Sequence, residues 1–246
     1  MRAVVLIPTY NEVLNIREVL EGILARDIEG LEILVVDDDS PDGTAAVVEE
    51  MAASDARVRL LLRRHERGRG RAGREGFLAA LEAGADLVIE MDGDGSHRPE
   101  DIEKFIASAA EADVVLGSRF VPGGEVLDRG FHRDLLSNLA KWYVSLVLGL
   151  DYSDPTTGFR AFTRSALERI DPKSLLARDP FIVTEVLYRA HRGGLRVREI
   201  PIVFCNRRHG VSKLKLSVLL KYFYRVVRLR FAAPPPDPGA FTKEKE

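Results

Sequence analysis

The chain has 246 residues, enough to bury one good core, so we expect a single α/β domain with a C-terminal appendage. Its formal net charge of −2 excludes a wholly basic nucleic-acid-binding protein, and one cysteine, Cys205, excludes an internal disulfide framework and fits a reducing compartment. No apolar run approaches the roughly 18 residues of a membrane-spanning helix, and no signal peptide is visible. We therefore expect a cytoplasmic protein, with any membrane contact peripheral and on the cytoplasmic face.

The first half of the chain alternates short apolar runs with helical periodicity. Helices are expected from Asn11, as a capping residue, and from Pro41, in a first helical turn. Two more are expected around Phe77 and over residues 102–109. Strands alternating with helices indicate βαβ units and a mainly parallel, Rossmann-like sheet flanked by helices. Buried strands are predicted at residues 3–7, 33–36, 58–62, 87–91 and 114–116.

The second half of the chain is less regular. A long helix is predicted over residues 135–148, a polar turn over 154–160 leads into a short strand, and another helix is expected over 182–191. A strand is predicted over 197–204, in which Pro201 indicates a sheet edge or a bulge. Gly-x-Gly-x-x-Gly is missing after the first strand, which argues against a dinucleotide cofactor.

A basic segment, residues 212–231, follows the expected domain. It contains no acid, and its periodicity predicts a basic amphipathic helix. Such a helix can lie in an anionic membrane surface or pack against the domain, and both alternatives are open here. The Pro-rich and then charged residues 232–246 predict a disordered tail. At about 100° per residue, one face carries Lys213, Lys221, Arg225 and Arg228, and the other carries Val218, Leu219, Tyr222, Phe223, Val226 and Leu229.

A strand that ends in two acids is the most informative stretch. The apolar run 87–91 stops at Asp-Gly-Asp-Gly, whose glycines allow a tight turn. Asp92 and Asp94 alternate there, so both carboxylates can point to one place outside the sheet, where ligands of open α/β sheets bind. Such a pair suits Mg²⁺ or Mn²⁺ shared with the phosphates of a substrate. The same pattern is also an ordinary polar turn, and His97 is either a further ligand or a hydrogen-bonding partner of the site.

A second acidic cluster, residues 37–39, ends the second predicted strand. In a doubly wound sheet it lies on the same edge as Asp92 and Asp94. One of its acids can then receive the N–H groups of a nucleobase or the hydroxyls of a ribose while the other pair holds the metal, which would neutralise the charge of a diphosphate leaving group. We also expect at least one of the three to cap the helix that follows.

Basic residues suggest a further anionic ligand. Arg119 follows a strand directly, and Arg133 and Ser137 are four residues apart on a predicted helix, a spacing that suits a phosphate. Arg207 and Lys213 lie close together in the sequence. Taken one at a time, each is more simply a solvated surface residue, but beside a diphosphate metal site they indicate binding of a second phosphate.

An arginine- and glycine-rich segment, residues 64–74, invites a nucleic-acid interpretation. It contains no aromatic residue on which a base could stack, so we expect no nucleic-acid binding here. A flexible loop that closes over phosphates is the expectation.

Seven short segments of the chain form recognisable motifs. They are Ile-Pro-Thr-Tyr-Asn-Glu (7–12), Val-Asp-Asp-Asp-Ser-Pro-Asp-Gly-Thr (36–44), Glu-Met-Asp-Gly-Asp-Gly-Ser-His (90–97), Gly-Ser-Arg-Phe-Val-Pro-Gly-Gly (117–124), Thr-Gly-Phe-Arg (157–160), Glu-Ile-Pro-Ile-Val-Phe (199–204) and Arg-x-x-Gly-x-Ser-Lys (207–213). Together they resemble the polyprenol-phosphate (dolichol-phosphate) mannose synthases, within family 2 of the inverting GT-A glycosyltransferases, and the resemblance extends from Ile7 to about Arg230. One departure is the arginine-rich stretch 67–74, which replaces the milder Gly-Leu-Gly loop of the family.

The resemblance implies a function and a site. It implies a GT-A catalytic domain over 1–211, the basic helix 212–231 and the tail 232–246. It implies transfer of mannose from GDP-mannose to a polyprenyl (dolichyl) phosphate with inversion, giving a β-linked product. Asp92 and Asp94 would bind Mg²⁺ or Mn²⁺. The implied nucleotide-sugar contacts are Pro8, Tyr10, Glu12, Val36, Asp38, Asp92 and Asp94, the implied acceptor-phosphate contacts are Arg133, Ser137, Arg207 and Lys213, and the implied catalytic residues are Asp94, Arg119, Arg133 and Arg207.

The chemistry of the acceptor agrees with this interpretation. A lipid monophosphate has its second pKa near ~6, so it is a good nucleophile at neutral pH and needs no dedicated general base. Catalysis would then consist of positioning and electrostatic stabilisation. Contact with the lipid would come through the basic helix or a membrane-bound partner protein. The alternatives are transfer of glucose or another sugar from a UDP-sugar to the same lipid, a non-catalytic nucleotide-sugar-binding subunit, and a nucleic-acid-binding module.

Overall fold

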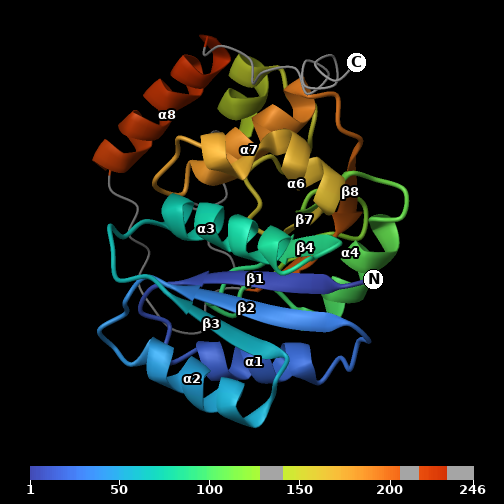
Figure 1. Ribbon diagram of the computed structural model, residues 1–246. Helices are drawn as coiled ribbons and strands as arrows, with labels where there is room; N and C mark the ends of the chain where they lie inside the picture. Colours follow the sequence, from blue (N-terminus) through green and yellow to red (C-terminus); the bar gives the residue numbers. More distant parts are fainter. Residues whose placement is uncertain (128–140, 206–215, 232–246) are drawn as a thin grey trace, which may run out of the picture.

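A seven-stranded sheet forms the centre of the protein (Figure 1). The computed structural model describes residues 1–127, 141–205 and 216–231. The strand order is β3-β2-β1-β4-β7-β5-β8, and β7 runs antiparallel to both of its neighbours while the other pairs are parallel. These strands are β1 (Ala3–Thr9), β2 (Leu31–Asp37), β3 (Val58–Leu62), β4 (Leu87–Glu90), β5 (Val114–Ser118), β7 (Arg160–Thr163) and β8 (Val197–Pro201).

Helices cover both faces of this sheet (Figure 1). Alternate residues of a strand point to opposite faces. Val4 and Leu6 of β1 therefore pack in one core layer and Val5 and Ile7 in the other. The first layer contains α3 (Arg69–Glu82), α6 (Arg164–Ile170) and α7 (Ile182–Arg192), and the second contains α1 (Ile16–Leu24), α2 (Thr44–Ser54) and α4 (Ile102–Ser108). The chain also forms a two-stranded sheet, β6 (Glu125–Val126) with β9 (Val203–Phe204), and two single turns of 3₁₀ helix, Pro99–Asp101 and Pro172–Ser174.

The mainly parallel α/β architecture and the predicted strands are confirmed. The strand predicted over residues 197–204 is divided into β8 and β9, and Pro201 ends the first of these at the edge of the sheet. This position suits proline, which has no N–H group for a further ladder. Of the helix predicted over 135–148, the described part, 141–148, is helical.

Two helix starts were predicted too early. Asn11 has a left-handed backbone (φ 60°), and α1 begins only at Ile16 after a turn in which the carbonyl of Glu12 accepts the N–H of Ile16 at 2.9 Å. Pro41 likewise lies in a turn, and α2 begins at Thr44. Both loops follow strands at the same edge of the sheet, so the chain uses these residues to build that edge and delays the helices.

The arginine- and glycine-rich segment is not a long flexible loop. Helix α3 begins at Arg69, inside the stretch that was predicted to be mobile. A Cβ atom on Gly70 would lie 2.4 Å from the carbonyl oxygen of Ala177, closer than any real contact. Gly68 has φ +149°, and a Cβ there would lie 2.1 Å from the carbonyl oxygen of Arg178. These glycines therefore permit close backbone packing of the start of α3.

The C-terminal helix, α8 (Leu216–Phe231), packs on the domain. Val226 is buried, and Tyr222 and Leu229 pack against the first core layer. The hydroxyl of Tyr222 lies 2.7 Å from the hydroxyl of Thr184 on α7. Of the two alternatives for the apolar face, packing against the domain is thus the one observed, and the side chains of Lys213, Val218 and Leu219 lie outside the described residues. No helix in the described ranges is long and apolar enough to cross a membrane.

The packing of Phe77 in the first core layer leads to a prediction about stability. Phe77 of α3 is fully buried and meets Phe162 of β7 edge-to-face, with ring centroids 5.5 Å apart. We expect Phe77→Ala to lower the free energy of unfolding by about 3–5 kcal/mol, because it removes this contact and leaves a cavity. Urea unfolding followed by circular dichroism measures the change. Phe231→Ala, at a side chain that is 82% exposed, is the matched control and should change stability by less than about 0.5 kcal/mol. Equal losses in the two variants would contradict the described core.

Candidate active site

Polar residues gather where β1, β2, β4 and β5 end. These four strands run in the same direction, so their carboxyl ends lie on one edge of the sheet. Tyr10, Asp38, Asp92 and Arg119 each follow one of them within two residues. This confirms the prediction that the two acidic clusters share an edge, which is where open α/β sheets bind ligands.

Asp37 holds the loops of this edge together. Its buried carboxylate accepts the hydroxyl of Thr9 at 2.7 Å and both the N–H, at 2.8 Å, and the hydroxyl, at 2.7 Å, of Ser40. The N-cap of α2 is Gly43, and the N–H of Thr44, the first helical residue, donates to Asp42 at 3.0 Å. The expectation that one of residues 37–39 caps this helix was therefore wrong: Asp37 ties β1 to the loop after β2.

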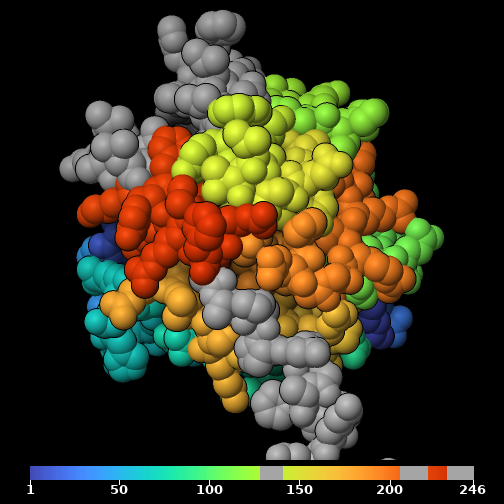
Figure 2. Space-filling model, turned by 90° about the horizontal axis from the view of Figure 1, so that it is seen from above, coloured from blue at the N-terminus to red at the C-terminus, as the bar shows by residue number. Residues whose placement is uncertain are grey.

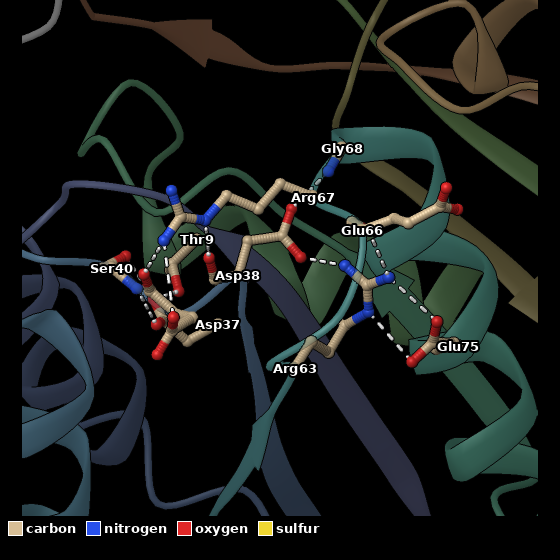
Figure 3. Close-up of polar contacts among 10 residues, drawn as sticks. Thr9, Asp37, Asp38, Ser40, Arg63, Glu66, Arg67, Gly68 and Glu75 are labelled. Atoms are coloured by element: carbon tan, nitrogen blue, oxygen red, sulfur yellow. Dashed lines mark hydrogen bonds and ion pairs between the residues drawn. The ribbon is translucent and has the colours of Figure 1, made fainter.

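Asp38, the predicted nucleoside contact, is bound by two residues of the segment between β3 and α3 (Figure 3). One carboxylate oxygen pairs with the guanidinium of Arg63, and the other accepts the N–H of Gly68 at 2.7 Å. Arg63 is itself buried and also pairs with Glu75 at 2.9 Å. These contacts fix the orientation of the Asp38 carboxylate, because both of its oxygens have a donor within the protein.

Arg67 contacts Tyr10, another predicted nucleoside contact, and the backbone of Asp38 and Asp39. Its guanidinium is 5.1 Å from the ring centroid of Tyr10, a cation–π distance. Its Nε donates to the carbonyl of Asp38 at 2.9 Å and its Nη2 to the carbonyl of Asp39 at 2.8 Å (Figure 3). The segment that was predicted to close over phosphates thus contacts the nucleoside end of the candidate site.

The remaining predicted nucleotide contacts lie in or beside the sheet. Pro8 and Val36 face each other across the β1–β2 ladder, and both are buried. Glu12 accepts the side-chain N–H of Asn15 at 2.9 Å, and its own N–H donates to Thr44 at 2.9 Å. The structure therefore places Pro8 and Val36 in the strands that lead to this edge and Glu12 in the loop after β1, while their contact with a nucleotide stays a prediction.

The two acids predicted to bind a metal both interact with His97. The His97 ring is buried, and burial is the largest cause that lowers its pKa below the ordinary value, whereas the carboxylates of Asp92 and Asp94 both act to raise it. The Nδ1 atom of His97 accepts the N–H of Asp92 at 3.2 Å, and the ring stacks on Phe159 at 4.8 Å. His97 is thus a hydrogen-bonding partner of this turn.

The carboxylates of Asp92 and Asp94 are hard oxygen ligands, and both are close enough to His97 to act on its pKa. Within the described residues, no group of three or more His, Cys, Asp or Glu side chains could hold a metal ion. A divalent ion bound by Asp92 and Asp94 would take its other ligands from a phosphate and from water, which is the usual pattern for Mg²⁺ at phosphate sites. The residues present therefore fit a metal shared with a substrate.

Arg119 is held in place by a buried acid. Its Nε and Nη2 atoms donate to the two oxygens of Asp154 at 2.6 and 2.8 Å, and Asp154 has no exposed surface. The guanidinium also lies 5.1 Å from the ring centroid of Phe204. The predicted phosphate-binding role of Arg119 stays a prediction. Arg133, Ser137, Arg207 and Lys213, also predicted to bind phosphate, lie outside the described residues.

A network of charged side chains next to Asp92 was not predicted from the sequence. Arg69 donates to Glu90 at 2.7 Å and to Asp92 at 3.2 Å, and Glu90 also pairs with Arg160 at 2.5 Å. Burial alone would raise the pKa of Glu90, but the guanidinium groups of Arg160 and Arg69 hold it below the ordinary value. The signal was available, because Glu90 is the one acid inside the apolar run 87–91 and a buried acid needs a charged partner.

The Arg63–Asp38 pair makes a testable prediction. Removing one partner of a buried ion pair leaves the other charge unpaired, so we expect Arg63→Met to lower the free energy of unfolding by about 3–5 kcal/mol. Arg64→Met removes the same charge from the next, exposed residue and should change it by less than about 0.5 kcal/mol. Chemical unfolding of the two variants side by side measures the difference. A stable Arg63→Met protein would mean that Asp38 does not depend on this pair.

Comparison with known proteins places the chain in a family. The chain is 39% identical, over 92% of its length and 85% of the relative's, to polyprenol monophosphomannose synthase of Mycolicibacterium smegmatis. It is 36% identical, over 95% of its length and 96% of the relative's, to undecaprenyl-phosphate mannosyltransferase of Micrococcus luteus. The fold is similar to that of glucosyl-3-phosphoglycerate synthase from Mycobacterium tuberculosis, solved with Mn²⁺, UDP-glucose and phosphoglyceric acid. That likeness has a TM-score of 0.67 at 18% identity and covers 93% of this chain and 78% of the other.

These findings confirm the family and the GT-A-like α/β fold that the sequence motifs indicated. The family model "Glycosyl transferase family 2" matches residues 4–171, which contain β1 to β7 and every described residue of the candidate site. The chain therefore belongs to glycosyl transferase family 2.

Proposed function

We propose that this glycosyltransferase moves mannose from GDP-mannose to a polyprenyl phosphate. The observation that carries the proposal is the meeting of Asp38, Asp92 and Asp94 at one edge of the sheet, which provides a nucleoside end and a metal-binding end for one nucleotide sugar. The two relatives that are similar over more than 90% of this chain are named for mannose transfer to polyprenyl or undecaprenyl phosphate. The identity of the sugar and of the lipid phosphate rests on these relatives.

Asp92 and Asp94 would hold Mg²⁺ or Mn²⁺. The structural neighbour solved with UDP-glucose also contains Mn²⁺, which supports a divalent ion in a nucleotide-sugar complex of this fold. When bound, the ion supplies positive charge that stabilises the departing diphosphate. The chain contributes the rigid turn: Asp94 accepts the N–H of Ser96 at 3.1 Å, and His97 fixes the backbone of Asp92.

The acceptor phosphate brings its own nucleophile. Because a phosphate monoester is largely ionised near neutral pH, the chain needs to orient it rather than to deprotonate it. Arg119, fixed by Asp154 at the same edge, is a preoriented cation for such an anion. Direct attack at the anomeric carbon from the side opposite the diphosphate inverts its configuration and gives a β-linked mannosyl phosphate.

One transfer assay tests the proposal. Purified protein is given Mn²⁺, a short polyprenyl phosphate and, separately, GDP-mannose, UDP-glucose or UDP-GlcNAc, and products are measured by mass spectrometry. We expect a mannosyl phospholipid from GDP-mannose alone, no product with a chelator, and a loss of about 10²–10³ in turnover for Asp94→Asn. Asp27→Asn, at an exposed acid in the turn before β2, should leave turnover unchanged.

The other outcomes decide between the alternatives. Product from a UDP-sugar keeps the reaction class and overturns the donor. Product formed in the presence of chelator overturns the role of the metal. Nucleotide binding without any product favours the non-catalytic subunit.

The membrane contact would come from the outer side of α8. Tyr222, Val226 and Leu229 face the domain. Among the described side chains of α8, the most exposed apolar ones are Tyr224, at 68%, and Phe231, at 82%, while Val227 is 39% exposed. Tyr224 and Phe231 are seven residues apart and therefore lie on one face of the helix. Exposed aromatic side chains of this kind suit the interface between water and lipid.

The neighbouring helix, residues 141–148, extends this surface (Figure 2). The hydroxyl of Tyr143 donates to the carbonyl of Phe223 at 3.1 Å, which holds the two helices side by side. Trp142 and Leu146 of the same helix are exposed one turn apart. Exposed basic residues on α8 surround the aromatic stripe and favour an anionic surface; they are Lys221, Arg228 and Arg230.

Vesicle binding tests this surface. We expect the double variant Tyr224→Ser, Phe231→Ser to lower partitioning onto vesicles with anionic lipid on the order of tenfold, because it removes two side chains that would enter the interface. Sedimentation of the vesicles measures the bound fraction. Leu14→Ser removes an exposed leucine from the turn before α1, on the other core layer, and should have no effect. Equal binding of the double variant and the unaltered protein would contradict the assignment.

A further inference from the structure

The segment Arg67-Gly68-Arg69 contacts both ends of the candidate donor site. Arg67 lies over Tyr10 at the nucleoside end, and Arg69, the first residue of α3, reaches Asp92 at the metal-binding end. This segment is also where the sequence departs from the Gly-Leu-Gly pattern of the family that it resembles. Arg69 thus places a positive charge beside Asp92, one of the two acids proposed to bind the metal.

Arg69 is attached to a fixed backbone. The N–H of Gly68 donates to Asp38 at 2.7 Å, and Gly70 packs directly against the carbonyl of Ala177. The side chain of Arg69 is only 19% exposed. Its position beside Asp92 is therefore set by packing and hydrogen bonds on both sides of it in the chain.

The contacts of Arg69 with its two acids differ in length and in exposure to solvent. Its Nη1 lies 2.7 Å from Glu90, which has no exposed surface and also pairs with Arg160. Its Nη2 lies 3.2 Å from Asp92, whose side chain is 34% exposed. The bond to Glu90 is short and shielded from water, whereas the bond to Asp92 is longer and open to solvent. A cation arriving from solvent can thus replace Arg69 at Asp92 but not at Glu90.

We propose that Arg69 competes with the divalent cation for Asp92 and thereby makes the binding of the metal and of the nucleoside diphosphate depend on each other. The inference rests on the proposed function in one respect, the assignment of Asp92 and Asp94 as the metal-binding residues of the donor site. In the protein without donor, Arg69 supplies the positive charge next to these acids. The metal must displace that contact to enter.

The charge balance explains the mutual dependence. Arg69, Arg160, Glu90, Asp92 and Asp94 carry two positive and three negative charges, which leaves one negative charge for the group. A divalent ion alone turns this into a net positive charge close to a buried guanidinium, which opposes binding. A diphosphate restores a net negative charge, so the ion and the nucleotide bind best together.

The hydrogen bond to Glu90 would keep Arg69 in the site after the metal displaces it from Asp92, where it could bind the diphosphate. Because Nη1 stays bonded to Glu90, the guanidinium does not leave the site when Asp92 takes the metal. Its Nη2, released from Asp92, becomes a charged donor for an oxygen of the diphosphate. Arg69 is then a residue that positions Asp92 before donor binding and binds the donor afterwards.

Isothermal titration with Mn²⁺, GDP and both together tests the proposal, and electron paramagnetic resonance counts free Mn²⁺ independently. For Arg69→Met we expect Mn²⁺ alone to bind about fivefold or more tightly than in the unaltered protein, because its competitor is gone. We also expect GDP with Mn²⁺ to bind about tenfold more weakly, because a charged donor is lost. Arg74→Met removes the same charge from an exposed position of the same helix and should change neither affinity by more than about twofold.

Circular dichroism first establishes whether Arg69→Met folds. If it does not, a second variant, Arg69→Lys, tests the proposal. Arg69→Lys keeps the charge and the pair with Glu90 but cannot contact both acids with a planar fork. It should bind Mn²⁺ alone more tightly than the unaltered protein, though less tightly than Arg69→Met. Mn²⁺ affinities equal to or weaker than that of the unaltered protein in every folded Arg69 variant overturn the proposal.

The readout separates this inference from the proposed function. Mn²⁺ titration needs neither a sugar donor nor a lipid acceptor, so the effect of Arg69 is measured even if mannose transfer is not found. Repeating the titration with UDP covers a different donor. Conversely, if the protein transfers mannose but its Mn²⁺ affinity is unchanged in the Arg69 variants, the proposed function stands and only the competition between Arg69 and the metal is overturned.

Discussion

A carboxylate without access to water, Glu90, lies at the end of the central strand β4, and the candidate site depends on how its charge is balanced. Burial of an unpaired carboxylate costs far more than folding can supply, so two arginines from different elements pair with it. Arg69 comes from the start of α3 and Arg160 from β7, and Arg160 also donates to the carbonyl of Val183 on α7 at 2.6 Å. One acid thus connects β4, α3, β7 and α7 directly beneath the turn that carries Asp92 and Asp94.

Two further acids at this edge of the sheet are also paired with an arginine. Asp38 is paired with Arg63, and Asp154 is paired with Arg119. In each pair at least one partner is shielded from water, which strengthens the interaction and restricts the orientation of both side chains. Under the proposed function, such fixed charges would need little rearrangement when phosphate groups bind. In the structure itself, the two arginines hold the acids Asp38 and Asp154 at this edge of the sheet.

Much of this could be predicted from the sequence. The alternation of apolar runs with helical periodicity predicted the strands and the mainly parallel sheet, and Asp-Gly-Asp-Gly after a strand predicted the position of Asp92 and Asp94 at the sheet edge. Helix starts were less accurate: Asn11 and Pro41 are good helix-start residues by type, yet both lie in turns that build the edge. The glycines at 68 and 70 were taken as a sign of flexibility, whereas they allow close packing against a neighbouring backbone. The direction of a glycine's effect depends on what lies next to it.

The sequence by itself determined the fold class, the edge that carries the site and the family, because these follow from local periodicity and from short motifs whose residues are neighbours in the chain. Only the tertiary structure decided which charges meet. Arg69 and Asp92 are separated by 23 residues, Arg63 and Asp38 by 25, and Arg160 and Glu90 by 70. No local pattern encodes such pairs, since they form only when helices and strands from distant parts of the chain pack together. For the same reason the sequence left open whether the apolar face of α8 packs on the domain or lies on a membrane surface, and the burial of Val226 in the core showed that this face packs on the domain.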